Sequence, residues 1–177
     1  ATVLPTGSVI EEAMGIGYGG LEAYGFHALE TFQCLTERRR GGETGVTAVQ
    51  AIRGEQIWKS QQQGRWSKEL LQAALAAAQI KVTDQELKTR LGTNSAFYLI
   101  DYRDGLQGTV AMVNGLGGQF GIALKLRGQA KPFVNWFKLQ EVKPFGHFAE
   151  LLKAIEKMIQ TGKAVYPVER TLLTSGI

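Results

Sequence analysis

The chain has 177 residues, of which 44% are apolar, and this is enough for one packed core but too short for two full domains. We therefore expect a single domain over residues 1–177. The net charge of +4 is the balance of 20 basic and 16 acidic residues, and the three tryptophans do not alternate with lysine or arginine as in a nucleic-acid stacking platform. We expect no nucleic-acid partner.

The setting in the cell is inferred from what the sequence lacks. No apolar run reaches the roughly 18 residues of a membrane span, and the N-terminus has no signal pattern. The one cysteine, Cys34, cannot form an internal disulfide, which fits a reducing compartment. We expect a cytoplasmic protein with no membrane contact. The chain has no initiating methionine and stops in a helix-like run, Thr171 to Ile177, so we also expect a piece of a longer protein.

The chain opens with a predicted strand and a predicted helix. Val9 to Met14 has strand character, interrupted by Glu11-Glu12, and Leu21 to about Glu37 places apolar residues at helical spacing. Gly41-Gly42 ends this helix. Arg38-Arg39-Arg40 lies in its last turn, where cations offset the negative end of the helix dipole, so we interpret the three arginines as a solvated helix end.

The next segment is less regular. Val46 to Ile52 is a weakly patterned strand, and Ser60 to Gly64 is a polar stretch. Ser67 is a suitable N-cap for a helix from Lys68 to Ala78, whose leucines and alanines share one face. Residues 79–94 predict a short helix or a loop.

The second half of the chain changes to the period of strands. Four strand-like runs are separated by Asp104-Gly105, Asn114-Gly115 and Gly128-Gln129, which are hairpin signals, so we expect an antiparallel meander. The fold class predicted is α+β, with a mainly antiparallel open sheet covered by helices. The four runs are Ala96 to Tyr102, Leu106 to Val113, Gln119 to Leu126 and Phe133 to Gln140.

Two helices are predicted after the strands. Apolar residues from Phe148 to Ile159 recur at spacings of three and four, and Gly162 stops the pattern. Tyr166-Pro167 then opens a last helix, since proline suits the first turn.

Three glycines at the first strand-to-helix junction match a dinucleotide fingerprint. Gly15, Gly17 and Gly20 satisfy G-x-G-x-x-G, which lets a backbone approach a pyrophosphate. Glu11-Glu12 interrupts the strand before them, and the chain does not continue as alternating strands and helices. We therefore favour the other interpretation, a tight bend with close packing of helix on sheet, and predict no cofactor-binding residues here.

Several residues are candidates for a sugar site, because aromatic faces pack on the C-H surfaces of sugars and arginine hydrogen-bonds hydroxyls. The alternative for them is ordinary packing and surface charge. For His147 we expect capping or packing at the start of its helix, and no metal site is predicted because His27, His147 and Cys34 lack ligand spacing. The candidates are Tyr18, Tyr24, Arg65 and Trp66.

A family resemblance is carried by Gly19-Gly20, Gly25, His27 and Glu30. These residues resemble the G-G-x-x-x-x-D-x-G-x-H-x-x-D segment of the glucose-fructose oxidoreductase and inositol dehydrogenase family (Gfo/Idh/MocA), with one spacer residue fewer before the histidine. The tail also resembles the closing helices of that family's C-terminal domain. Its matching segments are Gly146 to Leu152, Thr161 to Lys163 and Tyr166 to Leu173.

The resemblance implies the second half of an enzyme. It implies a substrate-binding and oligomerisation domain of an NAD(P)-dependent oxidoreductase, acting on a CH-OH group of a sugar or polyol, with His27 as the catalytic acid/base. NAD or NADP would be bound mainly by an N-terminal Rossmann domain that this chain lacks, so the chain alone is not expected to be active. A homo-oligomer through the sheet is expected.

The resemblance has one departure with a chemical consequence. The family's aspartate, one turn before the histidine, falls on Ala23, and a carboxylate there orients the imidazole. Glu22 or Glu30 would have to replace it, and Glu30 is on the same helix face. The alternative function is a non-catalytic ligand-binding or assembly module with the same fold.

Overall fold

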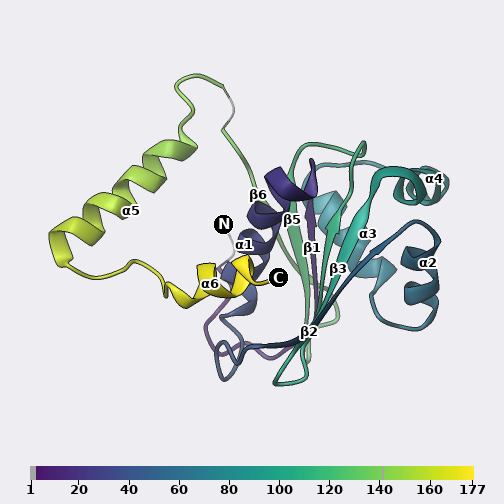
Figure 1. Ribbon diagram of the computed structural model, residues 1–177, viewed down its shortest axis with the longest axis horizontal. Helices are drawn as coiled ribbons and strands as arrows, with labels where there is room; N and C mark the ends of the chain where they lie inside the picture. The colour runs from purple at the N-terminus through teal and green to yellow at the C-terminus, as the bar shows by residue number, and fades with distance from the viewer. Residues whose placement is uncertain (1–2, 141) are drawn as a thin grey trace.

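A six-stranded mixed sheet is the centre of the computed structural model, which describes residues 3–140 and 142–177 (Figure 1). The order across it is β2-β3-β4-β1-β5-β6, with β1 parallel to β4 and every other neighbouring pair antiparallel. The predicted α+β class, with a mostly antiparallel open sheet, is confirmed. The strands are β1 (Ile10–Gly17), β2 (Val46–Arg53), β3 (Ala96–Tyr102), β4 (Gln107–Met112), β5 (Phe120–Leu126) and β6 (Phe133–Phe137).

The prediction of an uninterrupted meander is wrong at one place. Strands β4 and β5 are consecutive in the chain, but β1 lies between them and pairs with both. The turn signal at Asn114-Gly115 therefore begins a connection over β1 rather than a hairpin. Glu11 and Glu12, which interrupt the pattern of β1, face basic residues at the end of β5 and just after it: Lys125 Nζ is 3.5 Å from Glu12 Oε1, and Arg127 Nε is 3.3 Å from Glu11 Oε1.

The helices form a layer on each face of the sheet (Figure 1). A π-helical turn, Leu21–Gly25, leads into the first α-helix, which packs on β1, β4 and β5, whereas the third packs on β1, β5 and β6 from the other side. The helices are α1 (Phe26–Thr36), α2 (Glu55–Gln62), α3 (Lys68–Ala77), α4 (Asp84–Asn94), α5 (His147–Thr161) and α6 (Glu169–Ser175).

Helix α3 agrees with the sequence-based prediction, and helices α2 and α4 refine it. Helix α3 begins as predicted, because the Ser67 hydroxyl accepts a hydrogen bond from the Leu70 N-H. Helix α2 covers much of the stretch expected to be polar and irregular. Its sequence gives little helical pattern, since Ile57 is its only buried apolar residue. Helix α4 begins with a capping box between Thr83 and Glu86, so the 79–94 segment contains a full helix.

The alternation of side chains divides the core into two clusters. On the side of α1, the buried face of that helix, including Ala28, Leu29 and Phe32, packs on alternate residues of the strands. On the other side, Leu71 and Leu75 of α3 lead the second cluster, with α2 and α4 around it. Both faces of the sheet are thus covered over its central strands, which leaves β2 as a mostly exposed edge.

The glycines of β1 allow close approach of α1. A Cβ at Gly17 would lie 2.7 Å from the Ala28 Cβ and 3.0 Å from the Met112 Sδ, and one at Gly15 would lie 3.0 Å from the Phe32 ring. The close-packing interpretation of the glycine loop accounts for the contacts of Gly15 and Gly17, whereas a Cβ at Gly20 would meet nothing within 4 Å.

The three arginines that end α1 are not a solvated helix end. Arg39 is 4% exposed, its Nε is 2.6 Å from Asp104 Oδ2, and its Nη1 is 3.1 Å from Glu43 Oε2. Arg38 donates to the Leu4 carbonyl at 2.8 Å. Only Arg40 keeps the expected exposure. The charge pattern alone could not show this, because both carboxylates come from outside the helix.

Helix α5 projects from the body on two extended connections (Figure 1). None of its residues is buried. Gly162 ends it in the left-handed conformation, with φ 63°, as its sequence position predicted. The chain returns through α6, which packs on α1. Within the described residues, no helix has the length and apolar character needed to cross a membrane.

Candidate functional site

Both histidines of the chain line one hollow of about 640 Å³, at the end of the sheet where α1 starts. We call it the His27 hollow. Its volume lies within the range of roughly 300–1,000 Å³ that is typical of small-molecule sites. Its lining comes from the first turns of α1, from β5 and β6, and from the start of α5: Tyr24, His27, Glu30, Thr31, Phe120, Phe137, Lys138, Leu139, His147 and Phe148.

The first wall of the hollow is the side of α1 that faces away from the sheet. Ala28 and Phe32 of α1 are buried against the sheet, so His27 and Thr31 fall on the open side. Tyr24 precedes them by one turn, and its ring centroid is 6.0 Å from that of His27 in an edge-on arrangement. Tyr24 and His27 are both exposed to solvent and accessible to a ligand.

The opposite wall comes from the far end of the chain. The Nδ1 of His147 is 3.0 Å from the Gln140 carbonyl, and this contact fixes the ring at the start of α5. Because a carbonyl only accepts, Nδ1 carries a proton in this hydrogen bond, and the second ring nitrogen is left for a ligand. The His147 ring stacks on Phe148 at 4.4 Å. The expectation of simple packing or capping for His147 thus omitted its place in the hollow.

The side chain of Lys138 does not bring its charge into this hollow. Its Nζ lies 5.4 Å from the ring centroid of Trp136, which packs on the α3 side of the sheet. Much of the lining is aromatic or apolar, and its polar groups are the two imidazoles together with the side chains of Tyr24, Glu30 and Thr31.

Glu30, the carboxylate three residues after His27, is engaged elsewhere. It accepts a hydrogen bond from the hydroxyl of Thr174 on α6. Within the described part of the chain, no hydrogen bond or ion pair connects a carboxylate to His27. Glu22, the other candidate, is exposed and lies near Tyr98, where its charge adds to burial in raising the pKa of that phenol.

The predicted substrate residues fall into two groups. Tyr18 stacks on Tyr24 and on Phe120, each at 5.0 Å, so it borders the His27 hollow. Arg65 and Trp66 lie apart from it, on the α3 side. Arg65 is paired with Asp101 at 3.0 Å, and Trp66 is 5% exposed and donates to the Ile57 carbonyl at 2.9 Å.

The hollow beside Arg65 and Trp66 has a volume of only about 50 Å³, which is too small for a sugar. The two residues therefore contribute an ion pair and core packing. From the sequence alone, an arginine next to a tryptophan suits a sugar site as well as it suits core packing, because the sequence does not show on which face of the sheet the tryptophan packs.

No known family, curated protein or solved structure matches this chain. The site must therefore be judged on its own chemistry. Among the described residues, no group of three or more histidine, cysteine, aspartate or glutamate side chains is placed to hold a metal ion. The polar groups that the His27 hollow presents are suited to proton transfer and hydrogen bonding.

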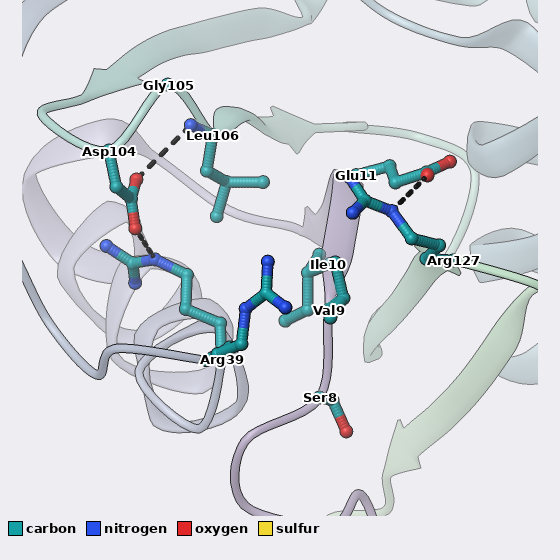
Figure 2. Close-up of a pocket in the computed structure, with 10 residues that line it drawn as sticks. Ser8, Val9, Ile10, Glu11, Arg39, Asp104, Gly105, Leu106 and Arg127 are labelled. Atoms are coloured by element: carbon teal, nitrogen blue, oxygen red, sulfur yellow. Dashed lines mark hydrogen bonds and ion pairs between the residues drawn. The ribbon is translucent and has the colours of Figure 1, made fainter.

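A second hollow, of about 460 Å³, lies at the opposite end of β1 (Figure 2). Figure 2 shows that four of its charged groups form two pairs: Arg39 with Asp104, and Arg127 with Glu11. The Leu106 N-H also donates to Asp104, at 3.2 Å. Arg40, which is exposed, adds one further cation. This hollow therefore offers little unpaired charge to a ligand, and we assign the candidate site to the His27 hollow.

Proposed function

We propose that the His27 hollow binds a sugar or polyol, as the substrate site of an oxidoreductase domain whose NAD or NADP is held by another domain. The observation that carries the proposal is that the only two histidines of the chain, far apart in sequence, line the same hollow. Both imidazoles can exchange a proton with a hydroxyl group. The resemblance to the Gfo/Idh/MocA family supports the same assignment.

The walls of the hollow suit this class of ligand. The exposed aromatic rings of Tyr24 and Phe148 offer flat apolar faces to the C-H surface of a sugar, and the imidazoles offer hydrogen bonds to its hydroxyls. A binding site of this type is mostly apolar with a few placed polar groups.

The contribution of this chain to the reaction is proton transfer. When a CH-OH carbon is oxidised, its hydride leaves and its hydroxyl proton must be accepted by a base. His27 is the proposed base, since it is exposed in the hollow on a helix held firmly against the sheet. In this proposal the chain's own residues supply ligand binding and the proton acceptor, and another domain holds the nucleotide.

One observation favours the second candidate, a non-catalytic ligand-binding or assembly module. Ala23 stands where the family has its aspartate, and Glu30 is engaged by Thr174 rather than by His27. An imidazole without a carboxylate partner is less well oriented for proton transfer, whereas ligand capture does not need one.

The proposal is tested first by ligand titration. The chain is titrated with glucose, sorbitol and myo-inositol while its two imidazole C-H resonances are followed by NMR and assigned with the variants His27→Gln and His147→Gln. Saturable shifts of both resonances are expected with at least one ligand. Lys81→Gln, at an exposed position outside the lining of the hollow, is the control. No shift with any of them would overturn the assignment.

A second measurement separates the two candidate functions. In the domain joined to a nucleotide-binding partner, His27→Gln should lower kcat by about 10²–10⁴-fold if His27 is the base, with a smaller change in KM. Hydride transfer that is unaffected by this substitution, together with retained ligand binding, would favour the non-catalytic module.

A further inference from the structure

Helix α5 presents an apolar surface that the chain does not cover. Leu152 is 63% exposed and Ile159 75% exposed, although a helix of a monomeric protein normally buries its apolar face. The surrounding connections add further apolar side chains. The apolar side chains exposed on α5 itself are Phe148, Leu151, Leu152, Ile155, Met158 and Ile159.

The size of this surface suits a protein interface. If each side chain is about half exposed and a large apolar residue offers about 150 Å² when fully exposed, the six on α5 offer roughly 450 Å², and Val165, Tyr166 and Val168 of the connection raise the total to roughly 700 Å². The largest apolar patch of a typical monomer is about 300–600 Å², and a stable interface buries about 800 Å² from each partner.

The exposed surface of α5 consists of a ridge of side chains and a groove beside it, and both are apolar. Phe148, Leu152, Ile155 and Ile159 follow one another at spacings of four, three and four, which is the α5 ridge. Beside it, an apolar groove of about 350 Å³ runs between α5 and the returning chain. The α5 groove is lined mainly by Leu151, Ala154, Met158, Val165 and Val168.

We propose that α5 pairs antiparallel with α5 of a second copy of this chain, each ridge entering the partner's groove about a two-fold axis. The register follows from the ridge: Phe148 lies opposite Ile159 of the partner subunit, and Leu152 opposite Ile155 of the partner subunit. In this register the ridge residues of the two copies meet along the length of α5 about one two-fold axis, and the charged residues of the helix stay on its outer side.

The charges of α5 favour a protein partner over a lipid surface. The helix carries Glu150 and Glu156 against Lys153 and Lys157, so it has no excess of cations for anionic headgroups. Antiparallel pairing also sets the two helix dipoles against each other favourably. This inference does not use the proposed function, and Phe148 is the one residue of the ridge that also lines the His27 hollow.

The first test is the mass of the chain in solution, by sedimentation equilibrium. A dimer is expected, and Leu152→Glu combined with Ile159→Glu should weaken it by roughly 100-fold or more while the circular dichroism spectrum is unchanged. Val49→Glu, at an exposed apolar position on the edge strand β2, is the matched control and should leave the dimer intact. A monomeric wild-type chain, or a dimer that only Val49→Glu disrupts, would overturn the proposal.

The second test fixes the direction of pairing. Phe148→Cys and Ile159→Cys are made in separate chains, each in a Cys34→Ser background, and oxidised alone or after mixing. Antiparallel pairing predicts a disulfide only in the mixture, whereas disulfides within each separate sample would contradict it.

A third test distinguishes a second copy of the chain from a lipid surface as the occupant of α5. Sedimentation of a monomeric chain with vesicles of anionic phospholipid would assign α5 to a membrane surface instead.

Discussion

The hydroxyl of Thr174 on α6 donates a hydrogen bond to the carboxylate of Glu30 on α1. The backbone carbonyls of Arg170 and Thr171 are also within reach of this hydroxyl, at 3.0 Å and 3.2 Å, but a carboxylate is the stronger acceptor. Together with the ion pair between Arg170 and Glu37, this bond fastens the returning chain to the helix that carries His27. The last helix therefore controls a carboxylate one turn from the candidate base.

Replacing Thr174 by valine should show separately how much this hydrogen bond stabilises the fold and whether it holds Glu30 away from His27. Thr174→Val keeps the shape of the buried side chain but removes the donor to Glu30, so the free energy of unfolding should fall by about 1 kcal/mol. The released Glu30 is then free to approach His27, and the His27 imidazole resonance should shift. Urea unfolding and NMR check the two outcomes. Ser175→Ala, at an exposed neighbour, is the control, and equal behaviour of the two variants would contradict the coupling.

The glycine loop gives a matched pair of substitutions. Gly17→Ala places a methyl group 2.7 Å from the Ala28 Cβ, so α1 must move and the free energy of unfolding should fall by about 1–3 kcal/mol. Gly20→Ala meets nothing within 4 Å and has an ordinary φ of -69°, so it should be nearly neutral. Thermal unfolding of both variants makes the comparison. Equal losses would show that close packing is not the reason for glycine at position 17.

The sequence predicted what short-range patterns control. The cap at Ser67, the strand at Ala96 to Tyr102 and the stop at Gly162 each depend on neighbouring residues, and the structure agrees with all three. The position of β1 between β4 and β5 depends on contacts between distant segments. Turn signals alone could not predict it, because they do not show whether another strand enters the gap.

In the candidate site, too, short-range spacing could be predicted from the sequence and contacts between distant segments could not. His27 and Glu30 were grouped from the sequence because helical spacing places them on one side of α1, and Tyr24 was a candidate because of its aromatic ring. His147 had no local signal that connected it with His27, since the two meet only through the course of β6 and the chain after it. Arg65 and Trp66 have the composition of a sugar site, but their backbone enters the other layer.

The ion pair between Arg39 and Asp104 should make the free energy of unfolding depend on pH in the acid range. Burial alone would raise the pKa of Asp104, but the hydrogen bond and charge of Arg39 outweigh it and hold that pKa below its usual value. The stabilisation is therefore present above the pKa of the unfolded chain and is lost as the pH falls through the lower pKa of the folded chain.

Asp104→Asn tests this dependence. The variant should be less stable than the wild type by about 1 kcal/mol at neutral pH, since the carboxylate is partly exposed, and the difference should shrink below about pH 3. Urea unfolding at both pH values measures it. Glu150→Gln, in the exposed pair with Lys153, should change little at either pH. A loss for Asp104→Asn that is equal at both pH values would contradict the assignment to the ionised carboxylate.

Cys34 should be an unreactive thiol whose burial is visible at alkaline pH. Burial raises the pKa of the Cys34 thiol from 9.0 to about 11, and the Sγ donates to the Thr31 carbonyl at 3.2 Å. At pH 8 the native chain should react with iodoacetamide about 100-fold more slowly than the urea-unfolded chain, because two pKa units reduce the thiolate fraction by that factor.

The raised pKa of the Cys34 thiol also determines how the free energy of unfolding changes at alkaline pH. Because the folded state holds the proton more tightly, the stabilisation is fully present below the pKa of the unfolded thiol and is lost as the pH rises toward the folded value of about 11. The unfolding free energy of the wild type should therefore fall more steeply between pH 9 and 11 than that of Cys34→Ala, which has no proton to lose at this site. Urea titrations of the two chains across this range compare the slopes. Parallel slopes, or rapid alkylation of the native thiol at pH 8, would show that Cys34 is open to solvent.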